Sequence, residues 1–174
     1  YTTNYNIAEA FRYAADNGAI ISQNSWGGPF ASREIQEAID YFIANAGIEN
    51  GQQTGPMKGG IVIAAAGNSQ NQVMNYPAAY SNVLAVTSIG PDFRKPNYSS
   101  YGSWTNIAAP GGNINMPNGG VYSTIAGGKY GFMEGTSMAC PHVSGVAALV
   151  LSKAVEHNRS YLMTPEILKE RLIT

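Results

Sequence analysis

Ile61-Val62-Ile63-Ala64-Ala65 is a run of consecutive apolar residues with the length of a strand rather than of a helix. A half-buried strand alternates apolar and polar residues, but this run leaves no position for a solvent-facing side chain. Such strands are typical of parallel sheets that helices cover on both faces. The stretches Ile20–Gln23 and Val83–Val86 also have buried-strand patterns. We therefore predict that these three segments are adjacent parallel strands, because right-handed crossovers place successive strands of this kind side by side.

Apolar residues recur at helical spacing in four segments around these strands. They are Asn4–Asn17, the stretch 32–46 with Ser32 as its N-cap, Ser137–Val155, and Thr164–Ile173 with Pro165 at its first helical position. Because Ser137–Val155 is apolar all round, we expect it to be buried on every side. Short strands are expected near Thr105–Ala108 and Val121–Ile125. This order predicts an α/β fold of three layers, a mostly parallel sheet flanked by helices, within a single domain.

The composition excludes several classes of protein. Only 12% of the residues are charged and 44% are hydrophobic, which is the opposite of a disordered chain. The net charge of −1 favours neither nucleic acid nor an anionic membrane as a partner. The longest apolar runs, Ile61–Ala66 and Val146–Leu151, are far shorter than the roughly 20 residues of a membrane span, so we expect none. A single cysteine leaves the redox compartment open. Abundant Gly, Asn, Ser and Thr with few charges favour a secreted, periplasmic or cell-surface location.

A glycine-rich turn leads into the third helical segment at Gly135-Thr136-Ser137. A serine at a helix N-terminus lies beside free backbone N–H groups and the positive end of the helix dipole. Both would stabilise an oxyanion that forms next to its Oγ. The ordinary alternative is that Ser137 only caps the helix.

The stretch Gly135–Gly145, GTSMACPHVSG, resembles the nucleophile segment of the subtilisin-like serine proteases. The resemblance continues in the family's order through Asn24–Gly28, Ala64–Asn68, Tyr76–Ala78 and Ala108–Gly111. It covers the whole chain, and lengths differ mainly in two apparent loops, 48–59 and 112–120. It implies a subtilisin-like fold and a serine endopeptidase that forms an acyl-enzyme on Ser137.

The resemblance also implies roles for further residues. Asn68 would donate its amide N–H to the oxyanion beside the backbone N–H of Ser137, although Asn after Gly67 is also an ordinary turn residue. Polypeptide substrate would bind along the strand end and in the primary specificity pocket, formed by Ser25, Trp26, Gly27, Ala65, Ala66, Gly67 and Asn75. Trp26 is equally well explained as a core residue. A neutral Asn75 at the pocket floor argues against selection of Arg or Lys.

The family's triad of Asp, His and Ser is incomplete here. Neither histidine is placed to act as the base. His142 lies about 140° around the helix from Ser137, and His157 lies some 20 residues after Ser137. Asp16, Asp40 and Asp92 have the pattern of solvated or capping residues, and Cys140 that of a buried free thiol. We therefore expect 1–174 to be a single partial domain, the C-terminal half to three-fifths of a subtilisin-like peptidase domain. The missing N-terminal part would supply Asp and His.

Other functions remain open in principle. The main alternative is a catalytically inactive subtilisin-like domain that binds peptides or serves as a scaffold. An α/β-hydrolase would need Gly-x-Ser-x-Gly, but Ala139 stands at the fifth position. Dinucleotide binding fails because no Gly-x-Gly-x-x-Gly follows a strand. No cofactor is required. The family often binds structural calcium, and the turn with Ala78, Tyr80 and Val83 is similar to its carbonyl-lined weak cation site.

Overall fold

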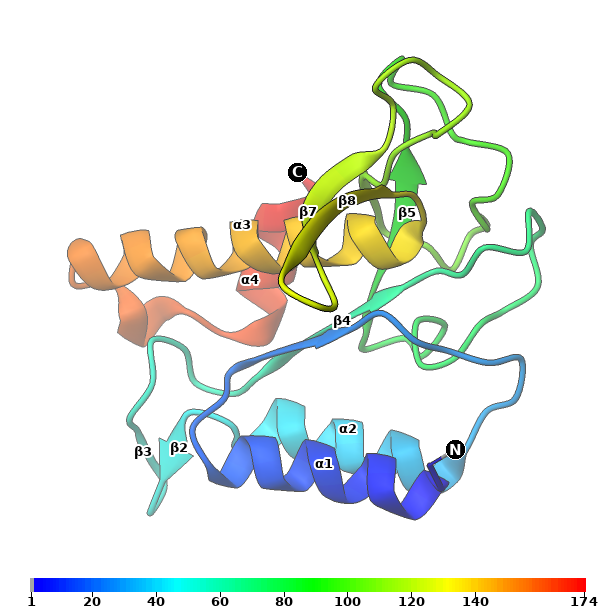
Figure 1. Cartoon of the computed structure of the whole chain (residues 1–174). Helices are drawn as coiled ribbons and strands as arrows, with labels where there is room; N and C mark the ends of the chain where they lie inside the picture. Colours follow the sequence, from blue (N-terminus) through cyan, green and yellow to red (C-terminus); the bar gives the residue numbers. More distant parts are fainter. Residues whose placement is uncertain (1) are drawn as a thin grey trace.

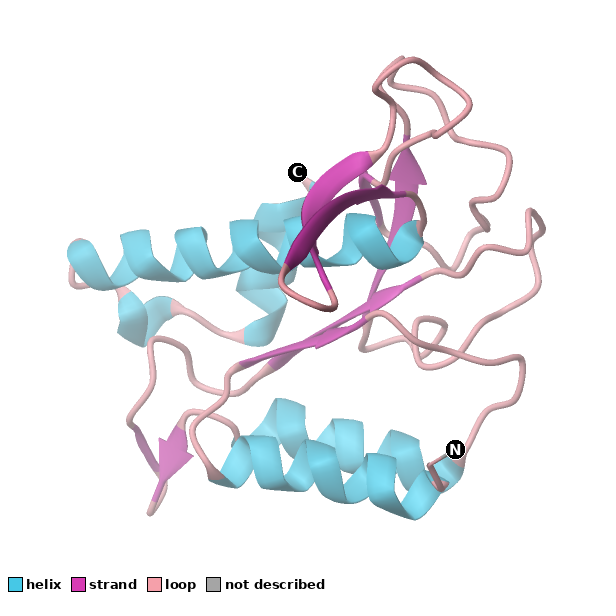
Figure 2. Ribbon diagram, viewed as in Figure 1, coloured by secondary structure: helices cyan, strands magenta, loops and turns pink. Residues whose placement is uncertain are grey.

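A four-stranded parallel sheet lies between two helical layers in the computed structural model, which describes residues 2–174 (Figure 1 and Figure 2). Its strands lie in the order β1 (Ile21–Asn24), β4 (Ile61–Ala65), β5 (Leu84–Ile89) and β6 (Ile107–Pro110), and every neighbouring pair is parallel. The predicted adjacency of the first three strands is confirmed; β1 is shifted by one residue, and β5 begins one residue and ends three residues later than predicted. Strand β6 begins two residues later than expected.

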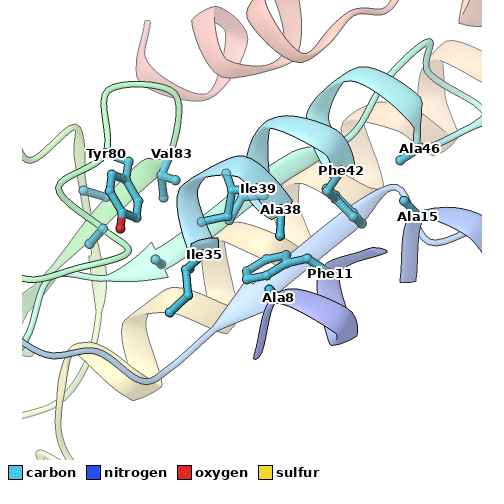
Figure 3. Packing of buried hydrophobic residues seen from close by; sticks show 14 residues of the cluster. Ala8, Phe11, Ala15, Ile35, Ala38, Ile39, Phe42, Ala46, Tyr80 and Val83 are labelled. Carbon is cyan, nitrogen blue, oxygen red and sulfur yellow. The ribbon is translucent and has the colours of Figure 1, made fainter. Parts of the chain in front are cut away.

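The fully apolar β4 strand serves both faces of the sheet. Val62 and Ala64 pack with α1 (Asn4–Asp16) and α2 (Arg33–Asn45) in one core, where Phe42 is fully buried (Figure 3). Ile61, Ile63 and Ala65 pack on the opposite face with α3 (Thr136–Glu156) and α4 (Pro165–Ile173). Successive side chains of a strand point to opposite faces, so a sheet covered twice needs apolar residues at every position.

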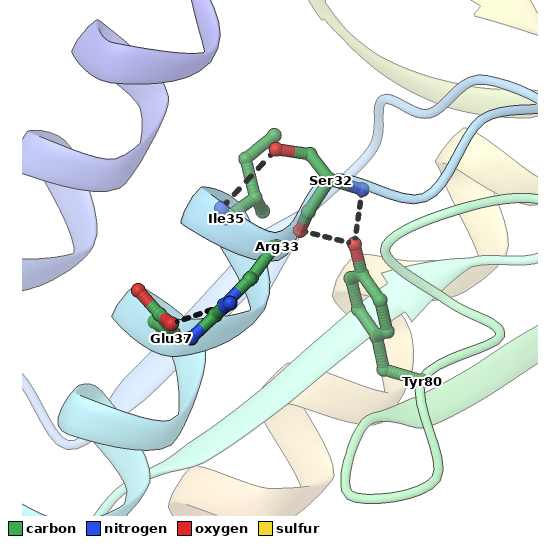
Figure 4. Close-up of polar contacts among 5 residues, drawn as sticks. All are labelled: Ser32, Arg33, Ile35, Glu37 and Tyr80. Atoms are coloured by element: carbon green, nitrogen blue, oxygen red, sulfur yellow. Dashed lines mark hydrogen bonds and ion pairs between the residues drawn. The ribbon is translucent and has the colours of Figure 1, made fainter.

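The predicted helix starts are confirmed by side-chain caps. Ser32 Oγ accepts the N–H of Ile35 at 3.4 Å, and Thr164 Oγ1 accepts that of Ile167 at 3.3 Å. Each bond satisfies one N–H group that the first helical turn leaves without a partner. At the start of α2, an ion pair between Arg33 and Glu37 one turn apart and a contact from the Tyr80 hydroxyl to the backbone of Ser32 add to the cap (Figure 4).

Helix α3 departs from the sequence expectation. One face contacts all four strands of the sheet, but Val146, Leu149 and Val155 are 50%, 70% and 49% exposed. The expectation of burial on every side is therefore wrong within residues 2–174, because the sheet covers only one side of the helix. In this part of the chain α3 is also the one helix whose length and mean hydropathy, 1.4, match those of a membrane span.

The smaller elements lie outside the main sheet. β7 (Val121–Ile125) has the predicted bounds and forms an antiparallel hairpin with β8 (Lys129–Met133), which the sequence analysis missed. Gly127 and Gly128 form its turn with φ values of +80° and +69°. A short hairpin of β2 (Ile48–Glu49) and β3 (Gln52–Gln53) lies within the predicted loop 48–59, and a 3-10 turn, η1 (Ser160–Leu162), precedes α4.

Candidate active site

Ser137 is the second residue of α3 and lies beyond the carboxyl end of β1. Its Oγ donates to the carbonyl oxygen of Ser25 at 3.3 Å, and Ser25 Oγ donates to the carbonyl oxygen of Ser137 at 2.7 Å. Gln23 Nε2 in turn donates to Ser25 Oγ at 2.6 Å. These reciprocal bonds hold the first turn of α3 against the end of β1, and the Ser137 side chain stays partly exposed.

Asn68 is oriented by Thr136, a buried residue that the sequence analysis did not single out. Asn68 Oδ1 accepts the backbone N–H of Thr136 at 2.9 Å and its Oγ1–H at 3.0 Å. Thr136 Oγ1 also accepts the N–H of Gly67 at 3.1 Å. Because a backbone N–H can only donate, these bonds assign the amide oxygen of Asn68 to the Thr136 side. Its Nδ2 group therefore points away from Thr136.

Two N–H donors flank Gly135, the N-cap of α3. A Cβ built on this glycine would lie 3.3 Å from Asn68 Nδ2 and 3.6 Å from Ser137 N. Neither nitrogen has a hydrogen-bond acceptor in the described part of the chain. Gly135 is buried with φ +148°, a conformation that side chains rarely adopt. The arrangement can bind an anionic oxygen next to Ser137.

The structure brings three of the predicted substrate-binding residues together. The Asn75 side chain lies between Gly27 and Gly67: a Cβ on Gly27 would collide with Asn75 Nδ2, and one on Gly67 would lie 3.2 Å from it. Gly28 and Tyr76 exchange backbone hydrogen bonds of 2.9 and 2.8 Å, which fixes the two segments to each other. Because Gly27 and Gly67 carry no side chain, the Asn75 side chain fits between them.

The other predicted contact residues lie differently. Ala65 and Ala66 are 3% and 0% exposed, so only their main chain could meet a ligand. Trp26 Nε1 donates to Asn24 Oδ1 at 3.1 Å, and its ring lines hollows next to α1 and to residues 29–32. Neither hollow includes Ser137 in its lining, although the resemblance implied that Trp26 contributes to the substrate-binding surface.

The β7–β8 hairpin lies beside the start of α3 (Figure 1). Between these two elements, a hollow of about 350 Å³ opens beside Ser137. Its lining includes Val121, Ile125 and Met133 from the hairpin and Met138, Pro141 and His142 from the helix. The sequence analysis did not predict the β7–β8 hairpin, although Gly127-Gly128 between two short segments with strand-like alternation of residues is typical of a hairpin turn. An apolar hollow of this kind suits an uncharged group that approaches the serine.

No side chain in residues 2–174 accepts the proton of Ser137 Oγ. His142 lines the hollow, but its Nδ1 is bound to the carbonyl of Met138 in its own helix at 2.8 Å. His157 lies at the opposite end of α3. Each aspartate has a partner elsewhere: Asp16 accepts from Tyr41, Asp40 from Asn82, and Asp92 from the backbone of Arg94.

Two groups near the site, the buried Cys140 thiol and the partly buried Tyr98 phenol, have raised pKa values. Burial raises the pKa of the Cys140 thiol, so it stays a thiol against the carbonyl of Asn24. Burial also raises the pKa of the Tyr98 phenol. Its hydroxyl lies 2.9 and 2.7 Å from the carbonyl oxygens of Gly111 and Gly112, and Gly111 in turn accepts the N–H of Gly135. Tyr98 therefore braces the turn on which Gly135 rests.

The three carbonyls expected at a cation site lie in the turn before β5. Val83 N donates to the carbonyl of Tyr80 at 3.0 Å, and Lys169 Nζ on α4 donates to the carbonyl of Val83 at 3.2 Å. One of the expected ligands is thus bound by an ammonium group.

Known proteins resemble this chain in sequence and in fold. The sequence model of the Subtilase family matches residues 1–174. Thermitase of Thermoactinomyces vulgaris is 40% identical over 147 residues, which are 84% of this chain and 46% of thermitase. The thermophilic serine proteinase of Bacillus sp. (strain AK1) is 38% identical over 85% of this chain and 32% of its own length. The chain thus spans about half or less of the length of these relatives.

Solved structures agree with the sequence comparison. The structure of the prenylagaramide maturation protease PagA superimposes with a TM-score of 0.80 over 98% of this chain and 56% of its own, at 26% identity. A protease structure from Pseudoalteromonas arctica PAMC 21717 gives 0.76 over 97% and 50%, at 30% identity. The predicted fold class is confirmed. Because the family's sequence model covers the whole chain and the same parallel sheet underlies these structures, the chain belongs to the subtilase family.

Proposed function

We propose that this chain is the nucleophile-bearing part of a serine endopeptidase that cleaves peptide bonds through an acyl-enzyme on Ser137. The observation that carries the proposal is the pair of unpaired donors, Ser137 N and Asn68 Nδ2, which both lie close to the position that a Cβ on Gly135 would take. Fixed N–H donors aimed at the developing oxyanion are the main source of transition-state stabilisation in acyl transfer. Asn68 meets this need because Thr136 already holds its oxygen.

The chemistry divides between this chain and a base that it lacks. Ser137 Oγ attacks the carbonyl carbon of the scissile bond while its proton passes to the base, and the carbonyl oxygen takes the negative charge between the two donors. The base then protonates the leaving amine as the C–N bond breaks, which leaves the acyl group on Ser137. Water then attacks the acyl carbon while the base takes its proton, and the bond to Ser137 Oγ breaks as the base returns a proton to that oxygen, which releases the acid product and frees the serine. No cofactor enters these steps.

The His and Asp of the triad would come from an N-terminal part of the same domain. Two features support a docking place for it. Strand β1 is an edge of the sheet, so its outer backbone groups can pair with a further strand. The apolar outer face of α3, with Val146 and Leu149, lies uncovered on the sheet side that also carries Ser137. The hollow at Ser137 is the open approach for the base.

Substrate would bind as an extended chain along Ser25–Gly27, with one side chain entering the space beside Asn75. Backbone pairing of this kind reads the shape of the chain more than its sequence. Asn75 is neutral and offers no charge for an Arg or Lys side chain, so we expect uncharged residues before the scissile bond. A peptidase of this breadth is suited to work outside the cell, and we include secretion in the proposal.

Fluorophosphonate labelling of the full-length protein tests the proposal. These probes phosphonylate serines that an adjacent base activates. We expect a single modified peptide containing Ser137 and cleavage of an unfolded protein substrate, both abolished by Ser137→Ala. Ser144→Ala, on the same helix, is the matched control and should leave both unchanged. An unlabelled but folded protein that still binds peptides would favour the inactive, peptide-binding alternative.

A further inference from the structure

The turn Ser81–Val83, directly before β5, receives a charged side chain from the last helix of the chain. Lys169 Nζ on α4 donates to the carbonyl oxygen of Ser81 at 3.3 Å and to that of Val83 at 3.2 Å. The two residues are 88 and 86 positions away in sequence, so this is a tertiary contact between the C-terminal helix and the central sheet.

The residues around this turn do not fit a metal ion. Calcium takes six to eight oxygen ligands and draws several of them from carboxylates. Here the carbonyl of Tyr80 accepts the N–H of Val83, and the carboxylate of Asp40 accepts from Asn82, within the turn, at 2.6 Å. Within residues 2–174 no group of three His, Cys, Asp or Glu side chains could hold a metal. A divalent ion would also meet the positive charge of Lys169.

The geometry points to a different solution: we propose that the Lys169 ammonium is the built-in cation of the Ser81–Val83 turn, in place of a metal ion. An ammonium carries three N–H donors and suits carbonyl oxygens that converge on one point. Its charge is held covalently in α4, so no ion has to be captured from solution. The proposal concerns stability and does not depend on the proposed catalytic function.

The surroundings of Lys169 support this role. The side chain is half-buried beside the fully buried Leu168, and burial lowers the pKa of its ammonium. Withdrawing a charge from water is costly unless polar groups replace the lost hydration, and two backbone carbonyls do so here. The rest of the turn is anchored separately, because the Tyr80 hydroxyl accepts the N–H of Ser32 and donates to its carbonyl, each at 2.9 Å (Figure 4). Lys169 thus adds a bond between α4 and the start of β5.

Thermal unfolding of the full-length protein in EDTA, and then with added Ca²⁺ or K⁺, tests the proposal. Lys169→Met keeps the length of the side chain and removes its charge, whereas Lys153→Met does the same to an exposed lysine paired only with Glu156. We expect Lys169→Met to unfold about 2–8 °C below Lys153→Met, with Lys169→Arg in between. The stabilisation of Lys169→Met by either cation should equal or exceed that of the wild type, since its turn carbonyls are free.

The proposal is overturned if Lys169→Met unfolds at the same temperature as Lys153→Met, or if either cation stabilises the wild type more than Lys169→Met. A second measurement needs no variant. Acetic anhydride should acetylate Lys169 of the folded wild type at least about tenfold more slowly than Lys153, because its half-buried nitrogen is bound to two carbonyls and shielded from the reagent, and this outweighs the larger fraction of neutral amine that its lowered pKa gives. Equal rates, read by peptide mass spectrometry, would contradict the proposed contact.

Discussion

The Asn68 side of Ser137 is held by several hydrogen bonds, whereas the opposite side opens on a hollow. On the Asn68 side, Thr136 joins the N–H of Gly67 to the amide oxygen of Asn68, and Gly135 is tied to Gly111. On the other side, Ser137 Oγ faces a hollow and bonds only to the carbonyl of Ser25. A carbonyl cannot take a proton from serine. In the proposed reaction, residues 2–174 would therefore hold the donors for the negative charge in place but offer no side chain that takes the serine proton.

This difference separates the oxyanion donors, which one turn and its neighbouring strand end can provide, from the general base, which they cannot. Oxyanion donors are backbone and amide groups at a helix start, and one turn with its neighbouring strand end suffices to fix them. A general base must approach the hydroxyl from outside that turn, so a separate segment has to carry it. Four predictions test this division, from the largest expected effect to the smallest.

The first prediction compares the 174-residue chain with a longer protein that also contains the proposed N-terminal part. We expect the chain alone to react with a fluorophosphonate about 10⁶-fold more slowly, because no base takes the proton of Ser137. The magnitude is borrowed from subtilisin that has lost its histidine, the reference case for this family. Stopped-time labelling with mass spectrometry measures both rates. Labelling within tenfold of the longer protein, lost again in His142→Ala, would show that His142 acts as the base.

The second prediction concerns the charge-binding side. In the longer protein, Asn68→Ala should lower kcat by about 10²–10³ with little change in KM, since Asn68 donates only in the transition state. This magnitude, too, is borrowed from subtilisin, whose own oxyanion-hole asparagine is the reference case for such a donor. Asn45→Ala on α2, far from Ser137, is the matched control. A decrease no larger than that of the control would remove Asn68 from the oxyanion site.

The third prediction separates the orientation of the Asn68 side chain by Thr136 from the hydrogen bond that Asn68 itself donates. Thr136→Val keeps the shape of the side chain but removes the hydroxyl that joins Gly67 to Asn68. We expect a loss of about 1–3 kcal/mol in the free energy of unfolding, because the N–H of Gly67 is left without an acceptor. Activity should fall roughly tenfold as Asn68 gains freedom. Thr136→Ser retains the hydroxyl and should recover most of both. Urea unfolding and peptide hydrolysis provide the two readings.

The fourth prediction is the smallest and concerns alkaline pH. Burial raises the pKa of Tyr98 above its ordinary value of 10.0, so the unfolded chain loses this proton first. The stability due to this group is complete below pH 10 and is lost as the pH rises toward the folded pKa, by up to about 1.4 kcal/mol per pH unit. Tyr98→Phe should lose stability at neutral pH and show a flatter decline above pH 10. An unchanged alkaline slope would contradict the assignment.

Residue patterns predicted most of the framework. The unbroken apolar run of β4 required cover on both faces, and the two separate cores supply it. Caps at Ser32 and Thr164 placed helix starts to within a residue. These features depend on local interactions. A regular spacing of apolar residues or a capping hydroxyl predicts the same local structure wherever it occurs in a sequence. The position of Ser137 at a helix start belongs to this class.

Long-range contacts decided what the patterns could not. Apolar residues all round α3 predicted full burial, but the exposure of Leu149 depends on whether another segment lies against it. Thr136 could not be singled out because its role comes from Asn68, 68 residues away. Lys169 looked like an ordinary helix residue until the fold placed its nitrogen against Val83. A sequence determines the local propensities of its segments, but which donors meet which acceptors depends on how those segments pack, and that only the tertiary structure decides.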